Sequence, residues 1–526
     1  MRAPRALLVA ALVAATLVAA APAPAATKAP APATTRASTP AAKPAATKAP
    51  AWPPLPPFDT AIAWSDCGDG WQCGTLNVPV DWADPGGETL GLALTRHPAT
   101  SPDQRIGILV ENPGGPGFGG VAFLQNTYGR LPDVVKGRFD LVSWDPRGTG
   151  NSRPVDCVDD AFLDLGANVA AVPDTAETLA VARQYSRAFA RGCVQREGAY
   201  AGEVGTRNSA RDLEAIRIAL GEPSITYLGY SYGTVLGMAY AQMFPTAVRA
   251  MVLDGPPDYW TSDLDYAHTQ AEGFMKALDA FLTWCTGSSS CALRAVGDPR
   301  ELFQQLLDRA NAGPIPTQYT ANGQTRTGAL TGTLFETAVI STLYDESRGW
   351  PLLGRALQSG AQGDAGLLLA LADSYMGRNV DGTWTSVLQA NAVIDCVDRP
   401  DPKPRSAARE LADVARFQSE LPPWGGAWAV SSCAGMPKPA KGDKLGDVHV
   451  TGTPPVLVVG TTGDPATPYS GAYAVVSRIA GSGLLTFEST EHTAYASGRS
   501  PCIDDAVDAY LVDGVMPAPG TSCLRG

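Results

Sequence analysis

Clustered positive charge is missing from this sequence. Its 40 Lys and Arg residues are outnumbered by 52 Asp and Glu residues, the formal net charge is −12, and the basic residues form no dense run. Nucleic acids and anionic membranes both attract proteins through clustered Lys and Arg. The composition therefore argues against both as partners, and we expect the acidic surface to keep the protein soluble.

The apolar stretch at the N-terminus is too short and too rich in alanine to span a membrane. It runs from Ala6 to about Ala21, follows Arg2 and Arg5, and leads into small residues in an Ala-Pro-Ala register. This arrangement is typical of a secretory signal peptide, which we assign to residues 1–26, so a secreted, extracellular protein is expected. Residues 27–57 are mostly Ala, Pro, Thr and Lys and bury too little apolar surface to fold. We expect a disordered leader or pro-segment there.

Histidine is scarce, with four residues in 526, and none lies near a cysteine in the sequence. The neighbouring cysteines also lack the two-residue spacing of a zinc knuckle, so no metal site is expected. Ten cysteines in an exported chain predict disulfides instead. We expect five local bridges between sequence neighbours, namely Cys67–Cys73, Cys157–Cys193, Cys285–Cys291, Cys396–Cys433 and Cys502–Cys523.

A serine lies at the centre of the segment Gly229-Tyr230-Ser231-Tyr232-Gly233. An apolar run precedes this segment and a helix-like run follows it, so Ser231 occupies a sharp turn from strand to helix. Such a turn strains the backbone of its central residue and brings two chain segments too close together for a Cβ atom at either glycine. Hydrolases carry a nucleophilic serine in this setting, and we predict that role for Ser231. The alternative is a turn that is only structural.

The rest of the pattern predicts an α/β protein with a parallel sheet. At 526 residues, 45% of them hydrophobic, the chain can bury a large core. Apolar runs that end in glycine-rich loops predict strands, and helical periodicity between them predicts helices. The expected strands are Thr75–Trp82, Glu88–His97, Ile106–Glu111, Phe139–Trp144, Ile225–Leu228, Met251–Leu253, Pro455–Gly460 and Leu484–Phe487, and the expected helices are Thr178–Arg191, Asn208–Leu220, Thr234–Phe244, Ala472–Ile479 and Ile503–Val512. The first two strands are expected to be antiparallel, and the site is expected at the carboxyl ends of the parallel strands.

Residues 259–449 lack the alternation of strands and glycine-rich loops. One helical face there carries large apolar side chains, at Phe274, Leu278, Phe281 and Cys285. We predict a helical lid over 259–449, inserted between a first core segment, 58–258, and a C-terminal core segment, 450–526. The expected fold class is therefore an α/β-hydrolase fold with a mostly parallel central sheet and an inserted helical lid.

A nucleophilic serine needs a base, and only one of the four histidines has a suitable position. His97 ends an early edge strand, His268 lies at the start of the lid, and His449 directly precedes a strand. His492 follows the last predicted strand and comes after Ser231, which matches the chain order of α/β-hydrolases. We predict His492 as the base.

The acid that orients the base has two candidates. Asp464 directly follows a buried strand, is fixed by Pro465 and the Thr467-Pro468 turn, and has suitable spacing before His492. Asp254 is the rival candidate, because it also ends a strand and some hydrolases carry their acid one strand earlier. We predict Asp464, for which a simple turn role is the alternative.

The oxyanion hole is predicted from backbone amides. The N–H of Tyr232, next to the serine, can combine with an N–H of the Gly114-Gly115 segment. Glycine is needed there because the amide has to approach the substrate carbonyl without a side chain in the way. A plain tight turn is the alternative for this segment.

Taken together, these residues resemble a known family, the secreted tripeptidyl aminopeptidases of actinobacteria, which are α/β-hydrolases related to prolyl iminopeptidase. The resemblance covers most of the mature chain and is weakest in the lid. The motifs that carry it are Asn112–Gly117, Asp145–Ser152, Asp212–Arg217, Gly229–Thr234, Val252–Gly255 and, in a TAP-like C-terminal module over Pro454–Cys523, Gly463–Pro468 and Glu491-His492. Two positions differ from the family pattern, since Glu491 stands where glycine is common and Phe118 where a small residue is common.

The resemblance implies Ser231 as nucleophile, Asp464 as acid and His492 as base. It implies a serine exopeptidase that releases short peptides, such as tripeptides, from substrates with a free N-terminus, without metal or organic cofactor and with no obligate protein partner. A secreted carboxylesterase with the same triad is the alternative.

An aminopeptidase also has to hold the ammonium group of its substrate, which calls for carboxylates near the lid. Asp258, Asp263, Asp265 and Glu272 are candidates at the lid entrance. For each of them a solvated acidic helix start that complements the helix dipole is the favoured interpretation, so none is assigned to the site.

Overall fold

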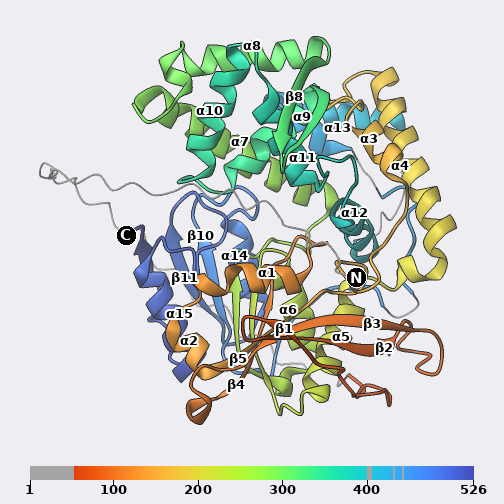
Figure 1. Ribbon diagram of the computed structural model, residues 1–526, viewed down its shortest axis with the longest axis vertical. Helices are drawn as coiled ribbons and strands as arrows, with labels where there is room; N and C mark the ends of the chain where they lie inside the picture. The colour runs from red at the N-terminus through yellow and green to blue at the C-terminus, as the bar shows by residue number, and fades with distance from the viewer. Residues whose placement is uncertain (1–51, 400–404, 431–432, 441–442) are drawn as a thin grey trace, which may run out of the picture. The chain divides into compact units, whose positions relative to one another are not determined.

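The computed structural model describes residues 52–399, 405–430, 433–440 and 443–526 (Figure 1). The expected signal peptide and most of the expected leader lie outside the described residues. Residues 52–57, the end of the expected leader, are described, and Trp52 and Leu55 pack against the largest hydrophobic core. No helix among the described residues is long and apolar enough to cross a bilayer.

A ten-stranded sheet with the order β1-β2-β3-β5-β4-β6-β7-β10-β11-β12 forms the centre of the fold. Strands β1, β2, β3 and β5 pair antiparallel, and the pairs from β5 onward are parallel. The bounds are β1 Ser65–Gly68, β2 Trp71–Pro79, β3 Thr89–His97, β4 Gly107–Asn112, β5 Phe139–Trp144, β6 Ile225–Tyr230, β7 Val248–Asp254, β10 Leu457–Thr461, β11 Gly483–Glu488 and β12 Ser522–Leu524. The mostly parallel sheet expected from the sequence is confirmed.

Helices cover both faces of this sheet, so most residues of its parallel strands are apolar. Alternate strand residues point to opposite faces, so Ile108 and Val110 join one core while Leu109 joins the other. The first core includes helices α5 Thr206–Ala219, α6 Gly233–Met243 and α14 Ser470–Arg478. The second includes α1 Gly120–Thr127, α2 Asp133–Arg138 and α15 Pro501–Asp513.

The lid has a hydrophobic core of its own, which includes Phe274, Leu278, Phe281 and Cys285, as the sequence pattern predicts. Its elements are α7 Asp263–Gly287, α8 Pro299–Ala312, β8 Ile315–Ala321, β9 Gln324–Leu330, α9 Gly332–Leu343, α10 Gly349–Ala361, α11 Gly366–Met376, α12 Val387–Asp398 and α13 Ala407–Glu420. Helices α3 Asp160–Gly166 and α4 Ala176–Glu197, which precede the nucleophile strand, also reach the lid. Arg183 of α4 pairs with Glu410 of α13 at 2.6 Å.

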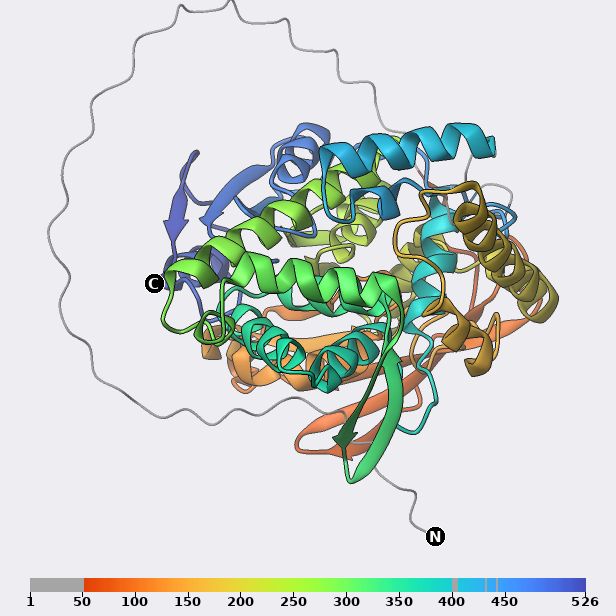
Figure 2. The ribbon, with the colours of Figure 1, turned by 90° about the horizontal axis from the view of Figure 1, so that it is seen from above.

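The antiparallel hairpin of β8 and β9 is a feature that the sequence analysis missed (Figure 2). Its turn is Asn322-Gly323, in which both residues have positive φ, 52° and 75°. An Asn-Gly turn between two alternating strands is a strong hairpin signal, so the sequence did contain the information.

All five predicted disulfides are confirmed. They are Cys67–Cys73, Cys157–Cys193, Cys285–Cys291, Cys396–Cys433 and Cys502–Cys523. The fourth bridge ties the lid helix α12 to the segment that leads back to the sheet.

A buried ion pair explains two of the recognised motifs. Arg147, from the loop after β5, and Asp212, from α5, are both fully buried and joined by two hydrogen bonds of 2.7 Å. The remaining N–H groups of Arg147 donate to the carbonyls of Pro79, Val80 and Glu203. Because every charge is compensated, the pair can exist in the core and fixes the loop at the carboxyl end of β5.

Glu111, on β4, is a buried carboxyl without compensation. Neither of its oxygens has a hydrogen-bond partner among the described residues. Burial raises the pKa of this carboxyl to about 8.

We predict that Glu111 makes stability depend on pH. The folded protein holds a proton on Glu111 up to about pH 8, whereas the unfolded chain loses it near pH 4.3. The stability that this group contributes is therefore complete at low pH and is lost as pH rises through the folded pKa. Glu111→Gln has no carboxyl to titrate and so lacks this pH dependence. Between the unfolded and the folded pKa of Glu111, the difference in unfolding free energy between the two proteins should therefore change by at most about 1.4 kcal/mol per pH unit. Urea unfolding at a series of pH values measures it, and parallel curves for the two proteins would contradict the prediction.

Candidate active site

Ser231 lies in the predicted turn between β6 and α6, and the predicted backbone strain is present. Its φ is 54°, a left-handed value that a non-glycine residue adopts only when its surroundings impose it. A Cβ at Gly229 would lie 2.5 Å from the carbonyl oxygen of Gly233, and a Cβ at Gly233 would lie 2.6 Å from that of Asn112. The glycines are therefore required by the close approach of three chain segments, and Ser231 itself remains partly exposed.

His492 and Asp464 form the predicted pair. Nδ1 of His492 lies 2.9 Å from both carboxylate oxygens of Asp464, whose side chain is fully buried. Asp464 also accepts hydrogen bonds from the amides of Ala466 and Thr467 and from the Thr467 hydroxyl. Because a carboxylate only accepts, the ring proton belongs on Nδ1, which leaves Nε2 free to take a proton.

The Asp464 carboxylate also sets the basicity of His492. Burial lowers the pKa of the imidazole, but the charge of Asp464 and its hydrogen bond raise it more, so the net shift is upward. The ring remains in contact with the lid, since its centroid lies 5.3 Å from that of Tyr344.

Asp254, the rival acid, has a different position and different partners. Its buried carboxylate accepts hydrogen bonds from the backbone amides of Ala494 and Tyr495, at 2.8–3.1 Å, rather than from the imidazole. Its own carbonyl accepts the amide of Ser231 at 2.9 Å. Asp254 therefore connects the turn of Ser231 to the loop that follows His492.

No hydrogen bond joins the Ser231 hydroxyl to the imidazole of His492 among the described residues. Within the described residues, no other side chain forms a hydrogen bond with the Ser231 hydroxyl. The connection runs instead through Asp254 and through Gly255, where a Cβ would lie 3.1 Å from Thr493 and 3.5 Å from Asp464.

The two segments predicted to form the oxyanion hole lie against each other. A Cβ at Gly114 would lie 2.9 Å from the amide nitrogen of Tyr232, so the two segments are in contact. Tyr232 is the N-cap of α6, where the amide has no intrahelical partner. The Gly114 amide already donates to Oδ1 of Asn112 at 3.0 Å. Gly115 is the member of the pair whose amide has no hydrogen bond within the described part of the chain.

Helix α12 of the lid contacts both segments that are predicted to form the oxyanion hole, which the sequence analysis did not foresee. Nδ2 of Asn391 donates to the carbonyl of Pro116 at 2.9 Å. Asp398, at the end of the same helix, accepts the phenol O–H of Tyr232 at 3.3 Å and the amide of Thr206 at 2.8 Å. No motif in the sequence marks these contacts, because they join residues that are far apart along the chain.

The two positions that depart from the family pattern both adjoin the predicted site, since Glu491 directly precedes His492 and a Cβ at Gly115 would lie 3.0 Å from the ring of Phe118. Glu491 is buried and faces Arg499 at 3.4 Å and Arg525 at 3.6 Å, so it anchors the loop of His492 from behind. Phe118 is 47% exposed.

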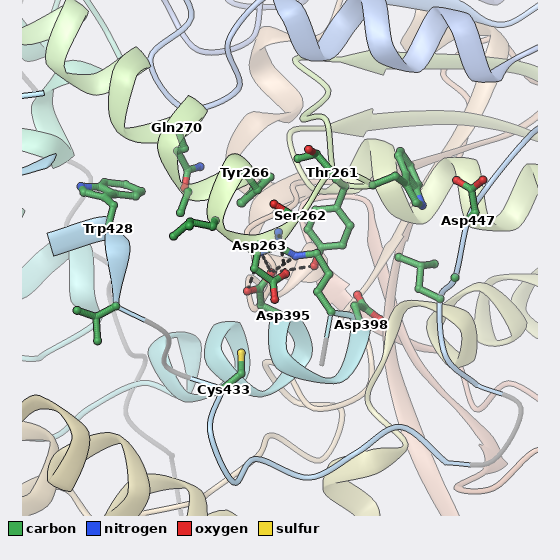
Figure 3. Close-up of a pocket in the computed structure, with 18 of the residues that line it drawn as sticks. Thr261, Ser262, Asp263, Tyr266, Gln270, Asp395, Asp398, Trp428, Cys433 and Asp447 are labelled. Carbon is green, nitrogen blue, oxygen red and sulfur yellow. Dashed lines mark hydrogen bonds and ion pairs between the residues drawn. The ribbon is translucent and has the colours of Figure 1, made fainter. Parts of the chain in front are cut away.

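A cavity of about 1070 Å³ lies between the lid and the core (Figure 3). Its wall includes Tyr259, Tyr266 and Gln270 near the start of α7, Asp395 and Asp398 of α12, and Trp428. Neither Ser231 nor His492 lines it. Two of its lining residues contact segments next to the predicted triad: Asp398 accepts the phenol O–H of Tyr232, and Gln270 donates to the carbonyl of Ala466 at 2.9 Å.

Family models match two stretches of the chain. Residues 108–324 match a model described as alpha/beta hydrolase fold, and residues 420–523 match one described as TAP-like protein. These matches confirm the expected fold class and the resemblance of the C-terminal module.

Curated relatives match along most of the chain. Serine protease Hip1 of Mycobacterium tuberculosis (strain ATCC 25618 / H37Rv) is 38% identical and covers 86% of this chain and 87% of its own length. Carboxylesterase B of the same strain is 35% identical, over 86% of each chain. Tripeptidyl aminopeptidase of Streptomyces lividans is 33% identical, over 88% of this chain and 86% of its own. The chain therefore belongs to the tripeptidyl aminopeptidase-like family of α/β-hydrolases.

Proposed function

We propose that this protein is an exported serine exopeptidase that releases short peptides, such as tripeptides, from free N-termini. The observation that carries the proposal is the hydrogen bond between His492 and Asp464. It lies at the carboxyl ends of the parallel strands, where Ser231 also occupies its strained turn. The names of two relatives, a serine protease and a tripeptidyl aminopeptidase, support a peptide substrate. The signal-like N-terminus and five disulfides support export.

The proposed reaction begins when Ser231 attacks the substrate carbonyl and Nε2 of His492 takes the hydroxyl proton. Asp464 stabilises the imidazolium that forms, and the amides of Tyr232 and Gly115 stabilise the oxyanion. His492 then protonates the leaving amine, and water hydrolyses the acyl-enzyme. In the proposed reaction, the hydrogen bond between the Ser231 hydroxyl and Nε2 of His492 forms as substrate binds, because catalytic hydrogen bonds tighten in the Michaelis complex.

The proposed domain organisation follows from the same elements. Residues 58–258 and 450–526 supply the core with the reacting groups, and residues 259–449 form the lid over the cavity. A lid in this position limits access to chain ends and so favours exopeptidase over endopeptidase action.

Paired assays separate the proposed peptidase from an esterase. We predict that the purified protein cleaves a tripeptide arylamide with a free N-terminus, in addition to any turnover of a short acyl ester. Strong ester turnover with no arylamide cleavage would overturn the peptidase proposal and favour the carboxylesterase alternative, which the 35% identical relative represents.

Ser231→Ala is predicted to lower activity by roughly 10³- to 10⁶-fold without loss of the fold. A fluorophosphonate probe gives an independent readout, because it labels only an activated serine. We expect labelling of the wild type at Ser231 and none of the variant. A folded wild type that never labels there would contradict a catalytic role and favour a binding protein.

Asp464→Asn and Asp254→Asn form a matched pair that separates the two candidate acids. Asp464→Asn removes the carboxylate that fixes the ring tautomer, and we predict a loss in kcat of about 10³- to 10⁴-fold. Asp254→Asn disturbs the backbone support of the loop and removes a smaller charge contribution to the His492 pKa than that of Asp464, so the predicted loss is smaller and comes with a lower melting temperature. The wild type should also lose activity as pH falls through the pKa of His492, which lies above its ordinary value. Equal losses in kcat for the two variants would contradict the assignment.

A further inference from the structure

One lid residue, Tyr344, contacts the predicted base through both its backbone and its ring. Tyr344 is the C-cap residue of α9. Its carbonyl oxygen accepts the backbone amide of His492 at 3.0 Å. Its ring meets the imidazole edge to face, with centroids 5.3 Å apart and an angle of 78° between the ring planes. The lid therefore holds the backbone and the ring of His492, in addition to the hydrogen bond at Nδ1 from Asp464.

The ring of Tyr344 is itself fixed by other lid residues. Its hydroxyl oxygen lies 2.8 Å from that of Tyr375, on α11. Its centroid lies 5.4 Å from that of Phe274, which is buried in the hydrophobic core of the lid. A ring held at its hydroxyl and against its face has little freedom to move. It can therefore serve as a fixed surface for the imidazole.

The next residue, Asp345, ties the same lid segment to the loop of His492 by charge. Both carboxylate oxygens of Asp345 lie 3.1 Å from Nη2 of Arg499. Arg499 also faces Glu491, the residue before His492, at 3.4 Å. The side chains of Asp345 and Arg499 are only 26% and 17% exposed, and salt screens partly buried pairs less than exposed ones. The connection is thus shielded from solvent.

Glu346 makes a second connection to this loop. Its carboxylate accepts the hydroxyl of Thr490 at 2.5 Å and pairs with Arg525 at 3.3 Å. Arg525 in turn faces Glu491 at 3.6 Å. Three successive lid residues, 344–346, therefore bind the loop that carries the predicted base.

We propose that the lid segment 344–346 positions the imidazole of His492, with Tyr344 as the residue that holds the ring. This inference rests on the proposed function, because it names what orients the base of the proposed triad. Hydrogen bonding at Nδ1 alone leaves the ring able to tilt about that contact, and the edge of Tyr344 restricts the tilt. A base has to lie within hydrogen-bond reach of the proton that it takes, and a misplacement of about 1 Å can cost about 100-fold in rate.

Substitution of Tyr344 in the full-length protein tests the inference. Tyr344→Leu removes the ring and keeps the backbone carbonyl. We expect kcat to fall by about 10- to 100-fold for both a tripeptide arylamide and a short acyl ester, with KM changed by less than about 3-fold, because both substrates need the same proton transfer. The rate of fluorophosphonate labelling should fall with kcat. Tyr344→Phe keeps the ring and should restore most of the wild-type kcat.

Proton NMR gives a readout that is independent of substrate. The Nδ1 proton of His492, which Asp464 holds, should give a downfield signal in the wild type and in Tyr344→Phe. In folded Tyr344→Leu we expect this signal to broaden, because a tilting ring exposes the proton to exchange with water. A residue with only a structural role would lower the melting temperature and leave the signal of the folded protein unchanged.

Two further variants keep the test decisive. Tyr473→Leu makes the same chemical change at a residue of α14 that is 58% exposed, and it should leave kcat, labelling and the NMR signal intact. Glu346→Gln keeps the ring of Tyr344 but removes the charge that pairs with Arg525, and it should lower kcat by about 2- to 5-fold for both substrates. It replaces Tyr344→Leu if that variant does not fold.

The outcomes separate this inference from the proposed function. Wild-type kcat with an unchanged NMR signal in the folded Tyr344 variant, or a loss confined to KM or to one substrate, would overturn the inference and leave the triad intact. A wild type that cleaves neither substrate and never labels with the fluorophosphonate would instead overturn the proposed function, and this inference with it.

Discussion

The arrangement of the site depends on the hydrogen bonds of one buried residue, Asp254, at the end of β7. Its carbonyl holds the amide of Ser231, and its carboxylate holds the amides of Ala494 and Tyr495 just after His492. Two segments more than two hundred positions apart along the chain are thereby fixed to one strand end. Desolvation raises the pKa of Asp254 to about 7, and the two amides oppose that shift because they stabilise the charged form. Asp254, the second candidate for the catalytic acid in the sequence, therefore supports the loops at the carboxyl ends of these strands.

The lid completes the site as well as covering it. Helix α12 holds Pro116 through Asn391 and Tyr232 through Asp398, so both proposed oxyanion segments depend on one lid helix. The disulfide between Cys396 and Cys433 anchors the same helix. A preorganised oxyanion hole needs such rigidity, because amides that must reorient during the reaction lose much of their stabilising effect. Lid and core therefore act as one unit in the proposed reaction.

Local sequence patterns were sufficient for much of the fold. The strand-to-helix turn at Ser231, the buried strands and the cysteine couples all follow from residues close together in the chain, and the structure contains each of them. The Asn322-Gly323 hairpin was equally local but was overlooked because helical periodicity dominates its surroundings. His492 and Asp464 could be paired from chain order, since the fold class fixes where each strand end lies.

Contacts between distant segments could not be predicted in the same way. Nothing near Asn391 or Asp398 in the sequence marks them, because their contacts depend on which element the lid brings against them. The choice of Gly115 over Gly114 depends on a hydrogen bond to Asn112 that only coordinates reveal.

The central claim is that the turn of Ser231, the imidazole of His492 and the two amides converge on one reacting carbon. A crystal structure of the protein after reaction with an aryl phosphonate tests it most directly, because the adduct mimics the tetrahedral intermediate. The account predicts phosphorus bound to Oγ of Ser231, one phosphonyl oxygen within about 3 Å of the amide nitrogens of Tyr232 and Gly115, and Nε2 of His492 within hydrogen-bond distance of the adduct. An adduct whose oxygen points away from both amides, or an imidazole that stays remote from it, would contradict the account.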